Sequence, residues 1–354
     1  MKRIIHVVGA RPNFMKAAPV MRAVRESGVA EQTLVHTGQH YDAAMSEIFF
    51  RQLELPEPDV NLEVGSGSHA VQTARIMTRF EEVVIKERPD LVLVYGDVNS
   101  TVASALVCSK LGTPVGHVEA GLRSFDRTMP EEINRLLTDQ IADLLFTPSV
   151  DGDENLKREG IAEDKIHRVG NVMIDTLVRL LPRTDAIETP ASPYILVTLH
   201  RPSNVDDPER LAAILDCLNV VARDARVVFP VHPRTRRAME SADRPTDASP
   251  GLTLCDPVGY IEFLAWQRRA ALVITDSGGI QEETTYLGAP CLTLRSNTER
   301  PVTVTIGTNL LLGDDLERLK VEVRRILAGE GKQGRIPELW DGRAAERIAA
   351  ILAG

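Results

Sequence analysis

Short apolar runs that alternate with helical segments constrain the fold of this chain more than any other feature. The first run, Ile4 to Val8, is rich in β-branched residues, which is typical of a strand buried on both faces. It leads through Gly9-Ala10-Arg11-Pro12 to a segment where we expect a helix over about 13–26. Because the same order of strand, loop and helix recurs along the chain, the sequence predicts an α/β protein with doubly wound parallel sheets.

Two such domains are expected, because 354 residues exceed what a single core usually supports. A segment at 184–193, rich in Pro, Thr and Ser, predicts a linker. We therefore expect an N-terminal domain over 1–183, completed by a C-terminal helix at about 341–354, and a second domain over 184–340. The expected strands are 4–8, 33–36, 91–96, 115–118, 144–147 and 165–169 in the first domain, and 194–199, 227–231, 252–254, 271–275 and 291–294 in the second.

The composition argues against several classes of function. A formal net charge of -9 does not favour nucleic-acid binding. No apolar stretch is long enough to span a bilayer, and the first apolar run is too short for a signal peptide, so we expect no membrane association and a cytoplasmic location. The four cysteines contain no CxxC pair, so neither a disulfide framework nor a zinc site is predicted.

Three acids are expected at one edge of the first sheet. Asp97 comes directly after the predicted strand 91–96, and Glu119 directly after the strand 115–118. Glu131 follows Pro130, which suits the first turn of a helix. A single acid in such a place more often lies on a solvated surface. Because open α/β sheets bind ligands at the carboxyl ends of their strands, three acids together indicate a site for acid–base chemistry.

A glycine-rich turn in the second half predicts an anion site. Ser277-Gly278-Gly279 opens a predicted helix, where backbone N–H groups and the helix dipole favour a diphosphate, although such glycines can also serve only to tighten a turn. Glu283, one turn into that helix, is placed to accept hydrogen bonds from a ribose. Phe263 is placed to stack on a base, but its helix also carries Ile261 and Leu264, which makes core packing the commoner outcome.

Basic and imidazole side chains also gather at strand exits and helix starts. His200 and His232 follow two predicted strands; either alone would more often be structural. Together with Arg11, Lys16 and Arg201, they indicate a cluster that binds phosphate and stabilises a leaving group. We expect no metal, because no HExxH or Asp-x-Asp pattern presents a metal site with useful spacing. We also expect no nicotinamide or flavin cofactor, because no GxGxxG fingerprint follows the first strand in VVGARPNF.

Over nearly its full length the chain resembles the non-hydrolysing UDP-N-acetylglucosamine 2-epimerases. The motifs that carry the resemblance are, in order, GARPNFMK, HTGQHYD, YGDVNST, HVEAGLRSFDRTMPEEINR, VGNVMID, TLHRPSNVDD, VHPRTR, TDSGGIQEE and SNTERPV. The PEEINR helix after the HVEAGLR strand separates that group from the hydrolysing epimerases. The resemblance implies two Rossmann-like domains facing a central cleft, in a glycosyltransferase-B-like fold. It also implies a homodimer without a cofactor, which interconverts UDP-N-acetylglucosamine and UDP-N-acetylmannosamine and serves cell-envelope polysaccharide biosynthesis.

The resemblance also implies roles for individual residues. The catalytic acids would be Asp97, Glu119 and Glu131, with His200 beside the departing nucleotide. The substrate would be bound by Arg11, Lys16, Arg201, His232, Phe263 at the uracil, Ser277, Gly278 and Gly279 at the diphosphate, Glu283 at the ribose, and Arg300. Gln39 falls where some members bind a second, activating substrate molecule. Many members have an acid where this chain has Ser203, and the connector between Glu119 and Glu131 is shorter than in some members.

Other functions stay open at this stage. A 2-epimerase of another UDP-2-acetamido sugar, such as a diacetamido uronate, would have the same nucleotide motifs. Glu131 and its PEEINR motif disfavour a hydrolysing epimerase that releases free N-acetylmannosamine. A glycosyltransferase shares the fold but has no need for three clustered acids. A nucleotide-sugar binding protein without catalysis would require a broken acid set, and this set is intact.

Overall fold

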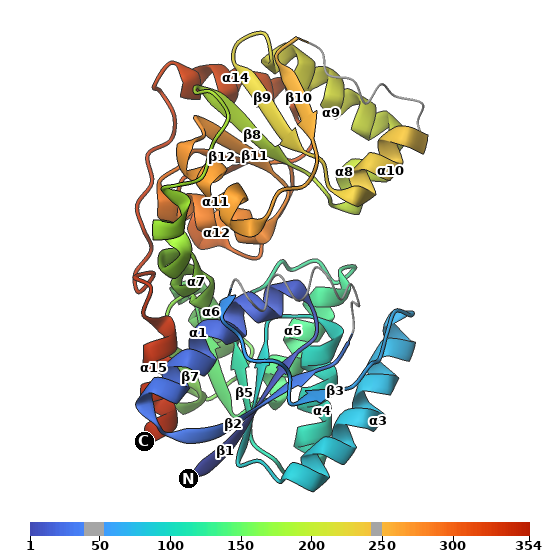
Figure 1. The fold of residues 1–354 in the computed structure, drawn as a ribbon, viewed down its shortest axis with the longest axis vertical. Coiled ribbons are helices and arrows are strands. Elements are labelled where there is room, and N and C mark those ends of the chain that lie inside the picture. Colours follow the sequence, from blue (N-terminus) through green and yellow to red (C-terminus); the bar gives the residue numbers. More distant parts are fainter. Residues whose placement is uncertain (39–52, 242–249) are drawn as a thin grey trace. The chain divides into compact units, whose positions relative to one another are not determined.

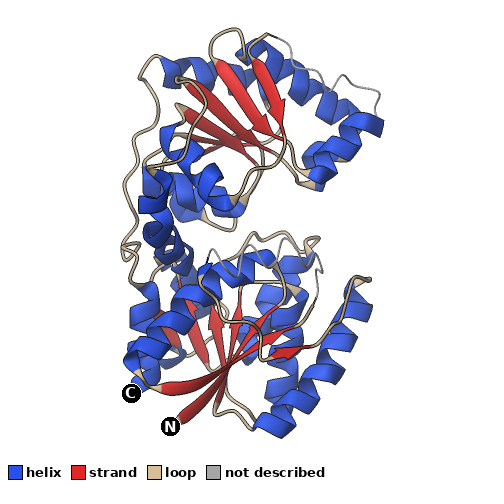
Figure 2. Ribbon diagram, in the orientation of Figure 1, coloured by secondary structure: helices blue, strands red, loops and turns tan. Residues whose placement is uncertain are grey.

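Every strand pair in the described chain is parallel, as expected of a chain in which strands and helices alternate. The structure, a computed structural model, describes residues 1–38, 53–241 and 250–354, apart from the side chains of Arg11 and Ser241. The chain forms two compact units, Met1–Thr176 with Glu338–Gly354, and Leu177–Pro337. Figures 1 and 2 show that each unit consists of a sheet with helices around it. The predicted class of two doubly wound α/β domains is confirmed.

The first unit has a seven-stranded sheet in the order β3-β2-β1-β4-β5-β6-β7. Its strands are β1 (Lys2–Val8), β2 (Ala30–His36), β3 (Val60–Asn61), β4 (Leu91–Tyr95), β5 (Val115–Val118), β6 (Leu144–Thr147) and β7 (Ile166–Arg168). Its helices are α1 (Arg11–Ser27), α3 (His69–Glu87), α4 (Asn99–Leu111), α5 (Pro130–Ile141), α6 (Val150–Arg158) and α15 (Ala344–Ala353), with α7 (Val172–Leu180) at its boundary and a short 3-10 helix, η1 (Glu163–Lys165). Helix α1 packs beside α15, and α3, α4 and α5 pack side by side.

The second unit has a six-stranded sheet in the order β10-β9-β8-β11-β12-β13. Its strands are β8 (Tyr194–Thr198), β9 (Arg226–Pro230), β10 (Leu252–Cys255), β11 (Leu272–Thr275), β12 (Cys291–Thr293) and β13 (Asn309–Leu311). Its helices are η2 (Leu181–Thr184), α8 (Pro202–Val205), α9 (Pro208–Val221), α10 (Pro233–Ser241), α11 (Tyr260–Arg269), α12 (Gly278–Leu287), α13 (Pro301–Thr305) and α14 (Leu316–Leu327). None of the described helices of either unit is both long enough and apolar enough to cross a membrane.

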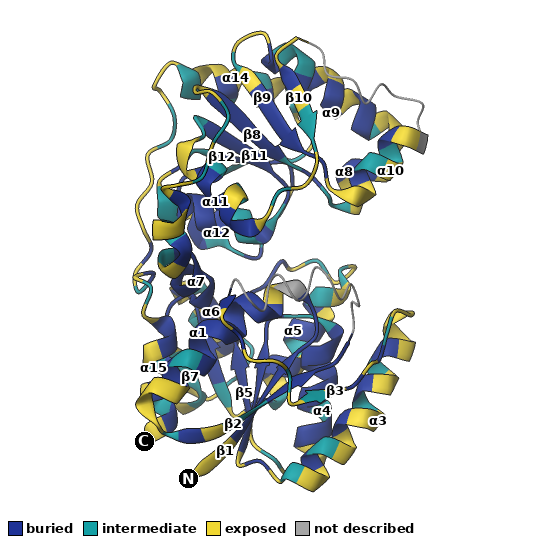
Figure 3. Cartoon of the chain, in the orientation of Figure 1, coloured by how far each residue is buried: buried dark blue, intermediate teal, exposed yellow. Residues whose placement is uncertain are grey.

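Apolar side chains of the strands form the core of each unit. In the first unit Val92, Val94 and Val115 pack with Ile76 and Phe80 of α3. In the second, the β8 and β11 strands pack against α9 and α14 in the same manner. The central strands β4, β5, β8 and β11 are buried along most of their length, and Figure 3 shows buried residues in dark blue. This burial explains why they read as continuous apolar runs in the sequence.

The direction of winding reverses once in each sheet. In the first, β1 lies between β2 and β4, and in the second β8 lies between β9 and β11. Open α/β sheets bind ligands outside the carboxyl ends of the strands at such reversals. The residues that follow these strands include Gly9 and Asp97 in the first unit, and His200 and Asp276 in the second. The fold therefore places two of the candidate residues, Asp97 and His200, where a ligand is expected.

The boundary between the units lies before the predicted linker. The structure divides the chain between Thr176 and Leu177, whereas the composition placed the division at residue 184. The segment that was expected to link the domains packs on α11: Arg268 donates to Thr184 Oγ1 (3.1 Å) and to Asp185 (2.6 Å). Thr184 and Asp185 therefore have partners in the second unit, which the composition alone does not indicate.

The last helix belongs to the first unit, although it follows the whole second unit in the sequence. Asp175 accepts hydrogen bonds from the backbone N–H groups of Ala344 (3.1 Å) and Ala345 (2.7 Å) at the start of α15. Trp340, buried just before that helix, donates through Nε1 to the carbonyl of Pro148 (2.9 Å). These contacts anchor the returning chain to the first unit.

Two glycines with left-handed backbones allow a matched test of packing at the edge that carries the acids. Gly121 has φ +81°, and a Cβ atom there would collide with the backbone of Gly152. Gly112 has φ +68°, but a Cβ atom would meet nothing within 4 Å. We expect Gly121→Ala to destabilise the first unit by about 2–4 kcal/mol, because the clash adds to the left-handed strain. Gly112→Ala should cost only about 1–2 kcal/mol, the strain alone.

Urea unfolding followed by the fluorescence of Trp340 measures this difference. The chain has two tryptophans, and Trp340 is the one in the first unit, so a Trp266→Phe background isolates its signal. Equal losses of free energy of unfolding for the two alanine variants would contradict the close approach of Gly121 to Gly152.

Candidate active site

Glu119 lies where β5 ends, with a backbone conformation that is uncommon outside glycine. Its φ angle is +74° and only 6 % of the residue is exposed. Its carboxylate forms an ion pair with Lys16, a residue of α1 that is also buried. Backbone strain of this kind is retained where surrounding contacts over-determine it, and such positions cluster at active sites. The strand exit therefore presents a fixed carboxylate with a cationic partner.

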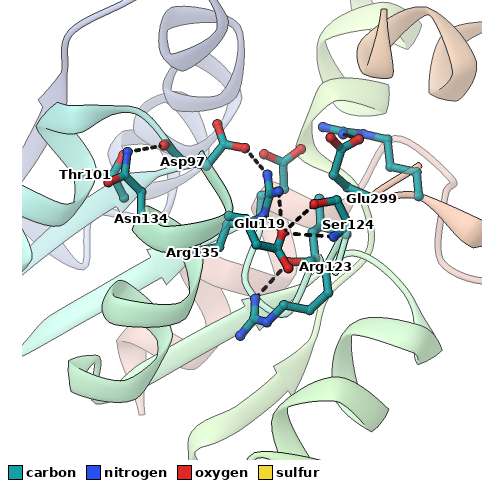
Figure 4. A network of polar contacts seen from close by, with 12 residues as sticks. Asp97, Thr101, Glu119, Arg123, Ser124, Asn134, Arg135 and Glu299 are labelled. Carbon is teal, nitrogen blue, oxygen red and sulfur yellow. Dashed lines mark hydrogen bonds and ion pairs between the residues drawn. The ribbon is translucent and has the colours of Figure 1, made fainter. Parts of the chain in front are cut away.

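Asp97 lies where β4 gives way to α4, and it is partly exposed. Its carboxylate forms an ion pair with Arg135 of α5, whose guanidinium also holds Glu132 through a 2.6 Å contact. Figure 4 shows the Asp97 and Arg135 side chains directed toward each other. Arg135 is almost fully buried, so its position is set by these two carboxylates rather than by solvent. The candidate acid Asp97 is thereby tied to α5.

Glu132, which the sequence did not single out, is the fixed carboxylate of the α5 start. It accepts hydrogen bonds from the N–H and Oγ of Ser124 (both 2.9 Å) and from the N–H of Phe125 (2.9 Å). Burial alone would raise the pKa of Glu132, but the Ser124 hydrogen bonds and the charge of Arg135 outweigh it and hold the pKa below its ordinary value. Glu132 thus shapes the connector between Glu119 and Glu131.

Glu131, in contrast, is half-buried, and its carboxylate has no hydrogen-bond or ion-pair partner among the described residues. It occupies the first turn of α5 after Pro130, where the helix dipole favours a negative charge. The adjacent acids of the PEEINR motif therefore differ in their surroundings: Glu132 points into the connector, while Glu131 retains unused acceptor capacity.

In the second unit, Asp276 organises the exits of the two strands beside the reversal. It is fully buried and accepts from the backbone N–H groups of His200 (3.1 Å) and Arg201 (2.9 Å) and from Asn204 Nδ2 (3.1 Å). Burial opposes the charge, but the hydrogen bond and the charge of His200 lower the pKa of Asp276. His200 Nδ1 lies 3.2 Å from the same carboxylate, while its ring is partly exposed. The ring is thereby oriented by Asp276.

The glycine-rich turn at the start of α12 lies beside an arginine. A Cβ atom on Gly278 would be 2.6 Å from Nη1 of Arg300, so a larger residue there would displace this guanidinium. Ser277 caps the helix without using its side chain, and its backbone N–H donates to Thr275 Oγ1 (3.0 Å). A helix N-terminus and a guanidinium at one place suit a phosphate group.

Two buried glutamates neutralise the arginines around that turn. Arg300 contacts Glu282 (2.8 Å), and Glu299 binds Arg295 through two hydrogen bonds of 2.8 and 2.9 Å. Arg201 lies 3.7 Å from Glu299. Burial would raise the pKa of Glu299, but the hydrogen bonds from Arg295 and the charges of Arg300, Arg295 and Arg201 hold it far below its ordinary value.

This charge cluster predicts acid sensitivity. A carboxyl group with a lowered pKa in the folded state adds stability above the unfolded pKa of about 4.3, and this stability is lost as the pH falls below that value. We therefore expect the free energy of unfolding of the second unit to decrease when the pH is lowered below about 4.5. The variant Glu299→Gln should show a weaker dependence of this free energy on pH. Glu317→Gln, which changes an exposed acid of α14, is the matched control. Urea unfolding at several pH values, followed by Trp266 fluorescence in a Trp340→Phe background, measures both. Identical pH slopes for Glu299→Gln and the unsubstituted Glu299 protein would contradict the role of Glu299.

The remaining candidates lie in differing environments. Glu283 is buried and already accepts from Tyr260 Oη (2.9 Å) and Gln267 Nε2 (2.6 Å), which places its carboxylate inside the unit. Phe263 is partly buried and packs against the small core of Tyr194, Leu196, Val228 and Val273. His232 is exposed, and its ring lies 5.7 Å from that of His200. Gln39 lies outside the described residues, and Arg11 begins α1 with a side chain that is not described.

Sequence reasoning missed the partners that hold the candidates in place. Arg135 and Glu132 lie inside the quoted PEEINR motif, and Asp276 precedes the quoted SGG turn, so a polar residue next to a candidate was the available signal. Among the described residues, no group of three or more His, Cys, Asp or Glu side chains is arranged to hold a metal ion.

Comparison with known proteins gives consistent results. The sequence matches the family model described as UDP-N-acetylglucosamine 2-epimerase over residues 22–353. It is 42% identical to a UDP-N-acetylglucosamine 2-epimerase of Methanocaldococcus jannaschii, over 98% of this chain and 97% of that protein. It is 45% identical to a UDP-2,3-diacetamido-2,3-dideoxy-D-glucuronate 2-epimerase of Pseudomonas aeruginosa, over 99% of each. A crystal structure of the Methanocaldococcus jannaschii UDP-GlcNAc 2-epimerase in complex with UDP-GlcNAc and UDP is similar at a TM-score of 0.88, with 41% identity and 99% of both chains covered.

Proposed function

The chain belongs to the UDP-N-acetylglucosamine 2-epimerase family, and we propose that it interconverts UDP-N-acetylglucosamine and UDP-N-acetylmannosamine without hydrolysis. The observation that carries the proposal is the complete acid set of Asp97, Glu119 and Glu131, two of which end neighbouring strands and are held by buried cations. A binding protein without catalysis would have no use for such a set.

The chemistry requires two proton transfers at carbon 2 of the sugar. That carbon is not next to a carbonyl, so its proton is not acidic in the intact substrate. When the bond between carbon 1 and the UDP oxygen breaks, the electron pair leaves with UDP, and carbon 1 gains oxocarbenium character. A carboxylate then takes the carbon 2 proton, and a double bond forms between carbons 1 and 2. The products of this anti elimination are UDP and 2-acetamidoglucal.

The return step reverses the elimination on the other face. The UDP oxygen re-forms its bond to carbon 1, and a carboxylic acid delivers a proton to carbon 2 from the side opposite to that of removal. Two faces call for at least two acid–base groups, and we assign this work to Asp97, Glu119 and Glu131 as a set. We assign to His200, oriented by Asp276, the stabilisation of the departing diphosphate.

We assign the binding of UDP chiefly to the second unit. The α12 N-terminus at Ser277, Gly278 and Gly279, with Arg300 beside it, suits the diphosphate. Arg201 and His232, and Arg11 and Lys16 of the first unit, are further proposed contacts. We propose that Glu283 binds the ribose through its carboxylate, which also accepts the hydrogen bonds described above. We propose that Phe263 contacts the uracil through the part of its side chain that is exposed. We also propose a cytoplasmic homodimer that serves cell-envelope polysaccharide synthesis, with Gln39 near an activating substrate molecule.

A second candidate substrate follows from the 45% identity to the Pseudomonas aeruginosa diacetamido-glucuronate epimerase. The experiment is to incubate the protein separately with UDP-N-acetylglucosamine and with UDP-2,3-diacetamido-2,3-dideoxy-D-glucuronate, and to separate the nucleotide sugars by chromatography. We expect the manno epimer from the first substrate, with no free sugar. Conversion of the uronate alone would move the proposal to that substrate, and release of free N-acetylmannosamine would contradict the non-hydrolysing reaction.

A further inference from the structure

A second set of buried charges lies behind the candidate acids in the first unit. His117, in β5, is fully buried, and its Nδ1 lies 2.6 Å from Asp139 of α5 while its Nε2 lies 2.8 Å from the carbonyl oxygen of Gly96. Asp139 is also fully buried, and it accepts from the backbone N–H of Gly121 (3.1 Å) and contacts Arg123 (2.7 Å). Both ring nitrogens of His117 therefore lie within hydrogen-bond distance of an oxygen, one of the Asp139 carboxylate and one of the Gly96 carbonyl.

These contacts act on the two turns that carry the acids. Gly96 directly precedes Asp97, and Gly121 closes the turn that begins at Glu119. The hydrogen-bonded pair of His117 and Asp139 therefore holds the exits of both strands. The His117 ring contacts the residue before Asp97 at the end of β4, and the Asp139 carboxylate contacts the turn at the end of β5. The two strands are neighbours, and Gly96 N–H also donates to the carbonyl of Val118 (3.0 Å).

The turn after β4 is held at three successive carbonyl groups. The Tyr95 carbonyl accepts from Asn13 Nδ2 (2.6 Å) and Thr101 Oγ1 (2.9 Å), and the Asp97 carbonyl accepts from Asn134 Nδ2 (2.8 Å). The carbonyl of Gly96, between those of Tyr95 and Asp97, is the one that His117 contacts. Gly96 has φ +63°, and a Cβ atom there would lie 2.6 Å from the Lys16 amine, so the turn passes close to the Lys16–Glu119 pair. A small shift of the Gly96 peptide would therefore displace Asp97 and crowd Glu119.

We propose that His117 and Asp139 are positioning residues for the epimerisation, holding Asp97 and Glu119 at a fixed separation through the Gly96 carbonyl and the Gly121 N–H. The proposal rests on the function proposed above. Neither residue touches the substrate, and both act through the acids. Misplacement of a catalytic group by about 1 Å can cost about 100-fold in rate, so the fixed turns affect turnover and not only stability.

Two amide substitutions of His117 separate positioning from simple stability. The amide nitrogen of asparagine lies near the place of Nδ1, and that of glutamine near the place of Nε2. His117→Asn therefore retains a donor toward Asp139 but loses the donor to the Gly96 carbonyl, whereas His117→Gln retains the latter. We expect kcat to fall by about 10–100-fold in His117→Asn and by clearly less in His117→Gln, while KM and the Kd for UDP stay near the wild-type values in both.

Two further variants complete the test. His6→Asn changes another fully buried histidine, which bonds Tyr95 Oη and none of the turn carbonyls, so it should lower Tm without changing kcat. If the His117 variants do not fold, Asn134→Ala removes the donor to the Asp97 carbonyl and should lower kcat in the same way. With an active wild type, equal kcat values for His117→Asn and His117→Gln would overturn the positioning role. If those two variants do not fold, a wild-type kcat in Asn134→Ala would overturn it. A wild type that converts neither UDP sugar would instead overturn the proposed function and this inference with it.

Discussion

Glu119→Gln is expected to lower the turnover of UDP-N-acetylglucosamine by at least about 100-fold, the scale of one acid–base group. The amide retains an oxygen that can accept from Lys16, but it can neither take nor deliver the carbon 2 proton. The Kd for UDP should stay near the wild-type value, because the proposed diphosphate site lies in the second unit. Steady-state kinetics and calorimetric titration with UDP measure the two quantities.

The matched control for Glu119→Gln is Asp143→Asn. Asp143 precedes β6, and its carboxylate accepts from the N–H of Val115 (2.9 Å) at the start of β5, the opposite edge of the same sheet. Removal of that charge should leave turnover unchanged. A loss of UDP affinity as large as the loss of kcat in Glu119→Gln would identify Glu119 as a structural residue.

Arg123→Met is expected to destabilise the first unit by about 3–5 kcal/mol, the usual cost of removing one partner of a buried ion pair. Arg123 is 2% exposed, binds Glu159 through two hydrogen bonds of 2.8 and 2.6 Å, and contacts the fully buried Asp139. Methionine fills a similar volume but supplies no donor. Urea unfolding followed by Trp340 fluorescence in a Trp266→Phe background measures the change.

Arg168→Met supplies the comparison for Arg123. Arg168 pairs with Asp153 (3.2 Å) and Glu338 (3.5 Å), and a third of its side chain is exposed. Exposed ion pairs contribute about 0–1 kcal/mol, so this variant should unfold almost as the wild type does. If both arginine variants lose the same free energy, the buried network is not what holds the β5 exit.

The strands and the fold class were predictable because parallel strands buried on both faces leave continuous apolar runs. Strands β5 and β6 begin and end where the sequence predicted. The two-residue β3 and the three-residue β13 were not predicted, although β7 and β12, which also have three residues, were. Helix α4 begins at Asn99, and polar Ser100 and Thr101 in its first turn are buried by hydrogen bonds rather than by apolar packing, so apolar periodicity does not show where this helix starts. The family resemblance and its glycosyltransferase-B-like fold are confirmed.

The sequence predicted that the candidate residues lie at strand exits, but it did not predict which side chains hold them in place. The sequence analysis singled out Glu131 and not Glu132, but it did not indicate their surroundings: among the described residues Glu131 has no hydrogen-bond or ion-pair partner, whereas Glu132 accepts from the connector and from Arg135. His117 appears in the sequence as one more strand residue, although its ring joins two turns. Such roles depend on which strands are neighbours, and that information becomes available only with the sheet order.

The central claim, epimerisation by elimination and re-addition, is tested most directly in deuterated water. The protein is incubated with UDP-N-acetylglucosamine, and the sugar is followed by proton NMR. Because a carboxylic acid that has exchanged with solvent returns the carbon 2 hydrogen, we predict UDP-N-acetylmannosamine with deuterium at carbon 2 and no free sugar. Formation of the epimer with protium retained at carbon 2, or UDP binding without any exchange or epimer, would contradict the account.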